Sequence, residues 1–174
     1  MTIAMQCRLA GADDAEALAV IGGATFLETF ADSIVGVDLL AHIRDRHAPS
    51  VYAGWLDDPG SRCWLGETET GAPVGYAVLT APDLPPALAG IGDLELKRIY
   101  LLSIAHRGGN GAAMMQAVLA EAGVMGARRV LLGVYGENHR AIGFYRRMGF
   151  VETGRRVFTV GTQVYDDLVF ARAV

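Results

Sequence analysis

A glycine-rich segment in the middle of the chain has the residue types of a phosphate-binding loop. It reads His106-Arg107-Gly108-Gly109-Asn110-Gly111-Ala112 and separates an apolar run, residues 94–102, from a stretch with helical spacing, residues 111–123. Glycines permit a tight turn, and the first N–H groups of a helix have no partner within the helix. The helix dipole and Arg107 would both attract an anion. A pyrophosphate cradle and a sharp turn without a ligand both fit this segment when it is considered alone.

Two common phosphate-binding motifs do not fit the same glycines. A Walker loop requires Gly-Lys-Ser or Gly-Lys-Thr, which the chain lacks. A dinucleotide fingerprint normally opens the first strand-helix-strand unit of a chain and is followed by an acidic residue about 20 positions on. The glycine segment instead lies beyond residue 100 and follows several predicted strands.

Two signatures together resemble the GNAT N-acetyltransferase superfamily, and the resemblance extends over the whole chain. The first is similar to the acetyl-CoA strand of that family and its Gln/Arg-x-x-Gly-x-Gly/Ala loop, and the second to its Asn, Ala, Phe-Tyr and Gly-Phe pattern. The first signature is Leu96-Lys97-Arg98-Ile99-Tyr100-Leu101 followed by His106-Arg107-Gly108-Gly109-Asn110-Gly111. The second signature is Asn138-His139-Arg140-Ala141-Ile142-Gly143-Phe144-Tyr145-Arg146-Arg147-Met148-Gly149-Phe150.

The resemblance implies a set of residues that bind acetyl-CoA. The cofactor-binding residues on the strand would be Ile99, Tyr100 and Leu101. The backbone at Ile99 and Leu101 would pair with the pantetheine arm, because the amides of pantetheine can add to an open sheet edge like an extra strand. The loop His106, Arg107, Gly108, Gly109, Asn110, Gly111 and Ala112 would surround the pyrophosphate, and Asn138 would hydrogen-bond the cosubstrate. Two positions depart from the family pattern: His106 replaces Gln or Arg, and Gly108 stands where Lys is common.

Two side chains are candidates for acid and base catalysis of acetyl transfer. Tyr145 would donate a proton to the departing thiolate, although a tyrosine beside Phe144 is also a normal core residue. Glu95 lies eleven residues before His106, the spacing of the base in the histone-acetylating branch. A glutamate that faces solvent from a strand fits that position equally well, in which case ordered water would remove the proton.

The acceptor pocket is the least determined part of the site. Phe26, Glu28 and Phe30 could line it, with the carboxylate attracting a cationic amine, and the same aromatic residues could simply be core. Residues 25–30 with Asp58-Pro59 resemble the bacterial polyamine acetyltransferase branch. We therefore expect a small primary amine such as a polyamine as acceptor. A protein or peptide amine, or a non-catalytic acyl-CoA-binding module, remain alternatives.

The periodicity of the chain predicts one domain, residues 1–174, of the α/β class with a mixed sheet. The resemblance implies the GNAT fold, with about seven strands, mostly antiparallel around a splayed parallel pair, and about four flanking helices. Strands are predicted at residues 3–9, 62–67, 73–80, 94–102, 128–135, 150–158 and 164–171. Helices are predicted at residues 15–23, 38–46, 111–123 and 138–148, with residues 25–55 helical but irregular.

Composition narrows the classes of partner. The net charge of −4 gives no general attraction to nucleic acid, and no apolar run approaches the roughly 20 residues of a membrane span. Without a secretory signal we expect a soluble cytoplasmic enzyme, with Cys7 and Cys63 as free thiols. No ligand spacing indicates a metal site. Exposed strand edges would allow a homodimer.

Overall fold

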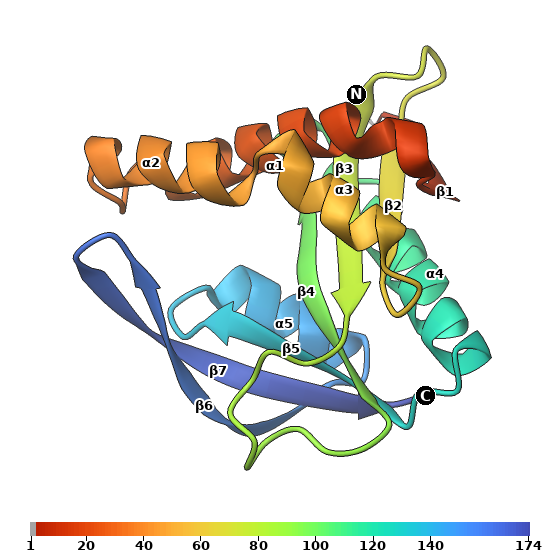
Figure 1. The fold of residues 1–174 in the computed structure, drawn as a ribbon, viewed down its shortest axis with the longest axis vertical. Helices are drawn as coiled ribbons and strands as arrows, with labels where there is room; N and C mark the ends of the chain where they lie inside the picture. The colour runs from red at the N-terminus through yellow and green to blue at the C-terminus, as the bar shows by residue number, and fades with distance from the viewer. Residues whose placement is uncertain (1–2) are drawn as a thin grey trace.

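The computed structural model describes residues 3–174, in which seven strands form one mixed sheet with helices on both faces (Figure 1). The strands are β1 Gln6–Leu9, β2 Arg62–Glu67, β3 Pro73–Thr80, β4 Asp93–Leu101, β5 Arg129–Tyr135, β6 Val151–Val160 and β7 Gln163–Ala173. Their order in the sheet is β1-β2-β3-β4-β5-β7-β6, and β4 and β5 are the parallel pair. The predicted fold class and the predicted β2–β3 hairpin are confirmed.

The helices differ from the prediction at the N-terminal side of the chain. They are α1 Ala15–Phe30, α2 Gly36–Arg46, α3 Pro49–Asp57, α4 Asn110–Val124 and α5 His139–Arg147. Helix α1 continues seven residues beyond the predicted end at residue 23, so Phe26, Glu28 and Phe30 lie on its last two turns. Helix α3 was not predicted as a separate element, although Pro49 at its first turn is a common helix start.

The sheet opens between its two parallel strands. Strands β4 and β5 pair only over Asp93–Glu95 and Arg129–Leu131, after which each continues without the other. Beyond that point β4 stays paired with β3, and β5 stays paired with β7. In Figure 1, β2, β3 and β4 consequently run across the direction of β5, β6 and β7. The result is the predicted splay, a wedge between two strands whose facing backbone edges are unpaired.

A β-bulge lies at the point where the splay begins. Val78 of β3 pairs with Arg98, whereas its neighbour Leu79 pairs with Leu96, so Lys97 is the extra residue on β4. A bulge increases local twist and redirects side chains, which is why bulges are frequent beside active sites. Here it helps β4 to diverge from β5.

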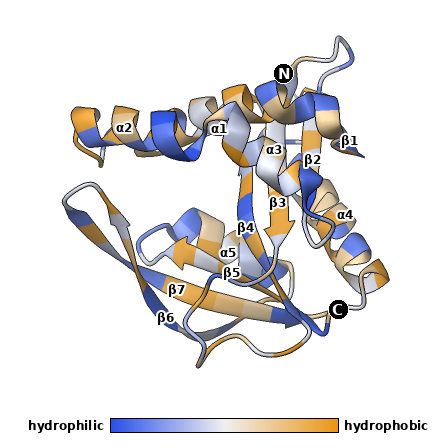
Figure 2. Cartoon of the chain, viewed as in Figure 1, coloured by the Kyte–Doolittle hydropathy of each residue, from blue (hydrophilic) through white to orange (hydrophobic). Residues whose placement is uncertain are grey.

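Two apolar layers hold the sheet. Helices α4 and α5 pack on one face, where Met114, Met115 and Val118 meet strand residues such as Leu79 and Leu132. Helices α1 and α3 pack on the other face, where Leu18 and Tyr52 meet Val78 of β3. Figure 2 colours these elements by hydropathy, with apolar segments on β3 and on the helices. The two faces of β4 contact these two layers. Side chains of β4 therefore point either toward α4 and α5 or toward α1 and α3. Cys7 and Cys63 are free thiols.

Candidate active site

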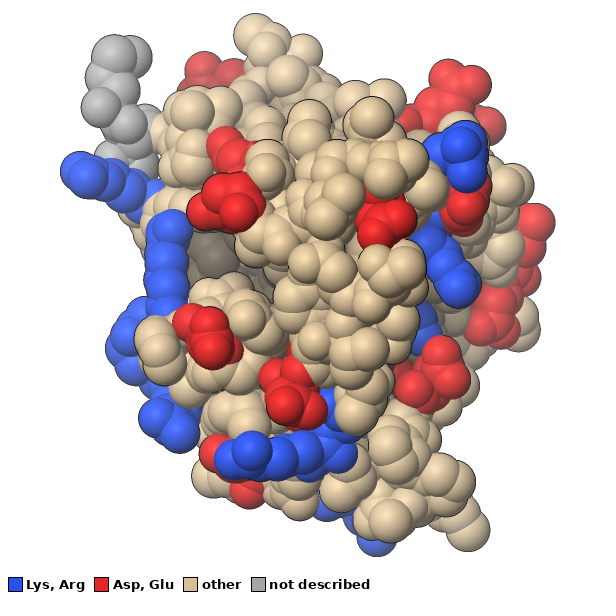
Figure 3. Space-filling model, turned by 90° about the vertical axis from the view of Figure 1, so that its left-hand side faces the viewer, with Lys and Arg blue, Asp and Glu red and all other residues tan. Residues whose placement is uncertain are grey.

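The splay leads into a cleft of about 1470 Å³ that crosses the molecule from α4 and α5 to α2 and the β6–β7 hairpin. Figure 3 shows the molecule hollowed on this side, with basic and acidic side chains at the rim. Most sequence-predicted site residues line it: Phe26, Glu28, Phe30, Glu95, Ile99, Tyr100, Leu101, His106, Gly109, Gly111, Ala112, Asn138 and Tyr145. A single cleft therefore brings together residues from both predicted signatures and from α1.

The backbone of β4 offers hydrogen-bonding groups to this cleft. Leu102 donates its N–H to Val74 O on β3 at 2.8 Å. Since successive residues of a strand direct their N–H and C=O groups to opposite sides, those of Leu101 and Ile99 point into the gap toward β5. These are the two residues predicted to pair with pantetheine. Apart from Leu101 O, which His106 Nε2 contacts at 2.8 Å, this edge has no strand partner beyond Glu95 and fits an extended chain that carries amide groups.

The glycine loop places the start of α4 at one end of the cleft. Gly108 and Gly109 both have φ of 78°, a left-handed conformation that glycine adopts without strain. Gly109, Gly111 and Ala112 face the cleft, and the first N–H groups of α4 have no carbonyl four residues earlier in the helix. This geometry is that of an anion-binding helix start.

Three residues of the predicted loop do not line the cleft: Arg107, Gly108 and Asn110. The Asn110 side chain is 7% exposed and its Nδ2 lies within 3.0 to 3.1 Å of the carbonyl oxygens of Ile3, Ala105 and Arg107. It therefore shapes the loop from behind. His106 Nε2 lies 2.8 Å from Leu101 O, so this ring folds back onto the end of β4. Helix α5 adds two cations that sequence analysis missed, Arg140 and Arg147.

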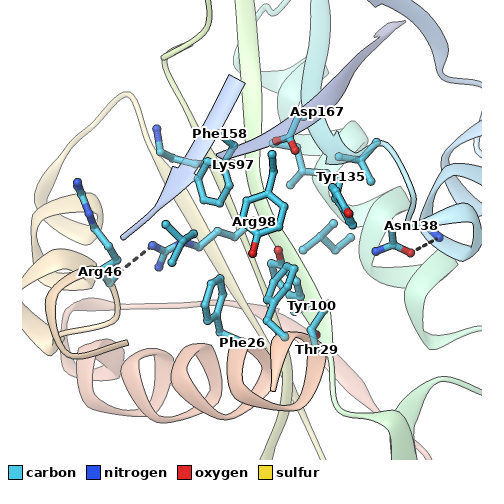
Figure 4. Close-up of a pocket in the computed structure, with 18 of the residues that line it drawn as sticks. Phe26, Thr29, Arg46, Lys97, Arg98, Tyr100, Tyr135, Asn138, Phe158 and Asp167 are labelled. Atoms are coloured by element: carbon cyan, nitrogen blue, oxygen red, sulfur yellow. Dashed lines mark hydrogen bonds between the residues drawn. The ribbon is translucent and has the colours of Figure 1, made fainter. Parts of the chain in front are cut away.

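Asn138 and Tyr145 come from the two ends of α5. Asn138 caps the helix, because its Oδ1 accepts a hydrogen bond from the Ala141 N–H at 3.1 Å. Its amide nitrogen points toward the cavity (Figure 4). Tyr145 is 9% exposed and packs edge-on against Phe144 and Phe150. Burial, with a smaller contribution from Tyr100, raises the pKa of the Tyr145 phenol well above its usual range, which keeps the hydroxyl protonated.

Glu95 is buried and does not face solvent. Its side chain is 1% exposed, and Oε2 accepts a hydrogen bond from the Asp83 N–H at 2.7 Å. Arg156 Nη1 lies 3.3 Å from Oε1, and Arg156 Nε lies 3.3 Å from Asp167 Oδ2. The exposed-strand alternative for Glu95 is therefore wrong. The cleft instead contains two carboxylates that share one guanidinium.

Asp167 is a site residue that sequence analysis missed. Burial raises its pKa above the usual range of an aspartate, although Arg156 partly opposes the change. The signal in the sequence was a pair of acids, Asp166 and Asp167, inside an otherwise apolar strand. Neither its inward direction nor its arginine partner could be read from that pair.

The predicted acceptor residues have different environments. Phe26 is 5% exposed, stacks on His42 with ring centroids 4.4 Å apart, and lies opposite Phe158 across the cavity in Figure 4. Phe30 is half-buried in the same apolar cluster. Glu28 accepts hydrogen bonds from the N–H and the hydroxyl of Ser103, at 2.9 and 2.8 Å. Its carboxylate therefore already has partners at the end of β4.

Comparison with known proteins identifies the family. Residues 27–150 match the model of the acetyltransferase (GNAT) family. The chain is also 35% identical over 159 residues to an uncharacterised N-acetyltransferase of Mycobacterium tuberculosis, covering 91% of this chain and 97% of the relative. The chain belongs to the GNAT acetyltransferase family. It is an acetyl-CoA-dependent N-acetyltransferase.

Solved structures share the fold of this acetyltransferase. The PaiA N-acetyltransferase of Thermoplasma acidophilum, determined with coenzyme A, has a TM-score of 0.75 at 14% identity and covers 99% of this chain and 100% of its own. The spermidine/spermine N-acetyltransferase SpeG of Vibrio cholerae, in mutant forms, has a TM-score of 0.65 at 16% identity, over 97% of this chain and 93% of its own. At such identities the likeness concerns the fold, so the polyamine branch rests on a distant neighbour.

Residues 3–174 offer neither a membrane-spanning helix nor a cluster of metal ligands. No helix in this range is long and apolar enough to cross a membrane. In the same residues there is no group of three or more His, Cys, Asp or Glu that could hold a metal ion.

Proposed function

We propose that this acetyltransferase transfers the acetyl group to the primary amine of a small molecule, by direct attack while both substrates are bound. The observation that carries the proposal is the position of the buried carboxylate pair. Glu95 is the last β4 residue paired with β5, so it lies where the splay opens. Amine and thioester approaching from opposite sides of the sheet would meet beside it.

The donor side is proposed to use the residues predicted from the sequence. Ile99 and Leu101 supply backbone groups for the amides of the pantetheine arm. The first turn of α4, at Gly111 and Ala112, supplies N–H groups for the pyrophosphate. Arg140 and Arg147 line the cleft from α5 and supply the positive charge that the loop lacks at Gly108. Asn138 contributes its free amide nitrogen as a further donor.

The reaction requires one proton to leave the amine and one to reach the sulfur. The neutral amine nitrogen forms a bond to the thioester carbonyl carbon, and the C–S bond breaks with its electron pair leaving on sulfur. Glu95, directly or through water, accepts the proton from nitrogen. Asp167 is the alternative base, because its pKa is raised toward neutral pH, where a general base works best. Tyr145 donates the proton that converts the thiolate to the thiol of CoA.

Contacts between the α1–α2 corner and the β6–β7 hairpin enclose the acceptor side of the cleft, which supports a small acceptor. The corner between α1 and α2 contacts the β6–β7 hairpin: the Val35 N–H donates to Gln163 Oε1 at 3.1 Å, and Gln163 Nε2 donates to Ser33 O at 3.4 Å. Phe26, Ile34, Leu39 and Val160 pack together beneath these bonds. These contacts bridge the cleft, which favours a small molecule, with polyamines as one class, over the surface of a folded protein.

Release of free thiol from acetyl-CoA tests the proposal. Small primary amines, including polyamines, amino acids and aminoglycosides, are compared with peptides at fixed acetyl-CoA, and the acetylated product is identified by mass. We expect amine-dependent thiol release with a small molecule. Release with peptides alone would transfer the proposal to a protein acceptor. No release with any amine, despite CoA binding, would overturn it.

A further inference from the structure

Arg98 is a half-buried cation in the cleft, and no carboxylate of residues 3–174 forms an ion pair with it. Among the ion pairs within residues 3–174, Arg156 contacts Glu95 and Asp167, and Lys97 contacts Asp83, but none includes Arg98. A cation withdrawn from water without a counter-charge is unfavourable unless a ligand supplies one.

The guanidinium of Arg98 is held in place by neutral groups. Nη1 donates to Tyr52 Oη and Nη2 donates to Arg46 O, both at 2.8 Å. Its Cζ lies 4.9 Å from the centroid of the Trp55 ring, in cation–π geometry. A guanidinium carries five N–H groups, so these bonds fix its orientation and leave donors for a ligand.

The histidines beside Arg98 carry no negative charge, and the positive charge of Arg98 lowers their pKa values. Burial, followed by the charge of Arg98, lowers the pKa of His42 to about 4 and that of His47 to about 3. Both rings are therefore neutral at pH 7. The guanidinium groups of Arg46 and Arg98 also lie at this end of the cleft, where Figure 4 draws the bond from Arg98 to Arg46 O.

The acidic residues that line the cleft have other partners. Asp45 is paired with Arg44 at 2.8 Å, and Asp83 with Lys97 at 3.1 Å. Asp38 has no ion-pair partner among residues 3–174; its Oδ2 lies 3.5 Å from the Thr162 N–H beside the β6–β7 turn. Glu95 and Asp167 share Arg156 and lie toward the splay. The cleft therefore has two carboxylates for one guanidinium where the amine must react, and farther along β4 the guanidinium of Arg98, which has no ion-pair partner among residues 3–174.

We propose that the acceptor is an amine that also carries a carboxylate, and that Arg98 binds this carboxylate. The inference rests on the proposed function and names the acceptor class within it. Glu95 and Arg98 lie on one strand, β4, and their partners Thr80 and Val78 on β3 are two residues apart because Lys97 is the extra residue of the bulge. The spacing between Glu95 and Arg98 along the strand is roughly 7 to 10 Å. The amine lies near Glu95 and the carboxylate near Arg98. A polyamine would instead place its second ammonium beside Arg98, where like charges repel.

The test compares acceptors that differ only in charge at the far end. Unbranched ω-amino acids from glycine to 6-aminohexanoate are assayed by thiol release beside their methyl esters and the diamines of equal length. We expect the wild-type enzyme to have a higher kcat/KM for at least one acid than for its ester and its diamine. The preferred length measures the distance between the reacting amine and Arg98.

Variants then assign the preference to Arg98. Arg98→Gln is expected to reduce the acid-to-ester ratio of kcat/KM by about 10-fold or more, as expected for loss of a charge-assisted hydrogen bond. Arg98→Lys should restore part of the ratio. Arg155→Gln, which removes an exposed charge on β6 outside the cleft lining, should leave it unchanged.

The outcomes separate the two proposals. A wild-type preference for diamines or esters would overturn the role of Arg98 while leaving acetyl transfer to a small amine intact, and this result needs no variant to fold. Equal losses for acid and ester in Arg98→Gln would show that Arg98 only holds Arg46 and Tyr52 in place. Absence of acetylation with every amine would count against the proposed function itself.

Discussion

Arg156 on β6 and Glu95 on β4 form an ion pair, with 3.3 Å between Nη1 and Oε1, although two strands separate β6 from β4 in the sheet. The pair lies at the start of the splay, because Glu95 is the last β4 residue that pairs with β5. Asp167 on β7 binds the same guanidinium. Ion pairs between side chains thus connect β4, β6 and β7 where the sheet begins to open.

Replacing Glu95 tests which carboxylate accepts the proton. Glu95→Gln keeps the shape but cannot accept a proton, so kcat/KM for the acceptor should fall by about 10²-fold. Asp167→Asn should have a smaller effect, below about 10-fold. The measurement is steady-state thiol release from pH 5 to 9, with CoA affinity as the control for folding. The opposite order of losses, with the acidic limb of the profile lost in Asp167→Asn, would assign the base to Asp167.

Tyr145 is expected to act in turnover and not in binding. Its raised pKa keeps the phenol protonated, and Tyr145→Phe removes only the hydroxyl from an otherwise apolar environment. We expect kcat to fall by about 10²-fold with acetyl-CoA affinity within about 2-fold of wild type. Tyr135→Phe is the matched control, because Tyr135 also lines the cleft but bonds Glu137 at 3.2 Å. Equal, small effects of both substitutions would remove Tyr145 from the mechanism.

The sheet was predictable because its strands are continuous apolar runs separated by turns. The β2–β3 hairpin has the predicted bounds, with Gly71 at its turn in a left-handed conformation. The first helix is longer than its predicted range, residues 15–23, although two adjacent glycines, Gly22 and Gly23, lower helix propensity there. In the structure α1 continues through Gly22, where the absent side chain makes room for Tyr52 and His47.

The predicted residues that line the cleft come from short sequence segments. The loop, Asn138 and Tyr145 belong to two short signatures. The environment of Glu95 depends on Asp83, 12 residues before it, and on Arg156, 61 residues after it. The acceptor side combines α1, α2, β4, β6 and β7 in the same way. No local pattern encodes such contacts, which arise from the topology of the sheet.

Gly109 tests the pyrophosphate loop. Gly109→Asp adds a negative charge at the start of α4, so CoA affinity should fall by about 10-fold or more. Gly126→Asp is a matched control: Gly126 also has positive φ, 76° against 78°, and a Cβ at either position meets nothing within 4 Å. Gly126 lies beyond the C-terminal end of α4. Gly126→Asp should therefore cause the same backbone strain as Gly109→Asp but leave CoA affinity unchanged. Calorimetric titration with CoA measures both; equal losses would point to strain alone.

His47 should make the fold sensitive to acid. Its pKa is near 3 in the folded state and about 6.5 when unfolded, so its contribution to stability is complete above pH 6.5 and is lost as the pH falls from there toward 3. Within that window the free energy of unfolding should fall by about 1.4 kcal/mol per pH unit for this group. His47→Asn should reduce that slope, measured by urea denaturation between pH 5 and 7. His139→Asn, at an exposed position, is the control and should leave the slope unchanged.

Gly22 and Gly123 should respond in opposite directions to the same substitution. A Cβ at Gly22 would overlap the Tyr52 hydroxyl and lie 2.6 Å from His47 Nδ1, so Gly22→Ala should destabilise the fold by about 1 to 3 kcal/mol through overpacking. Gly123 is also helical, but its Cβ would meet nothing within 4 Å, so Gly123→Ala should stabilise by up to about 1 kcal/mol. Urea denaturation at pH 7 measures both. Because Tyr52 also orients Arg98, Gly22→Ala should disturb acceptor binding as well, whereas an increase in stability would mean that α1 and α3 can separate without cost.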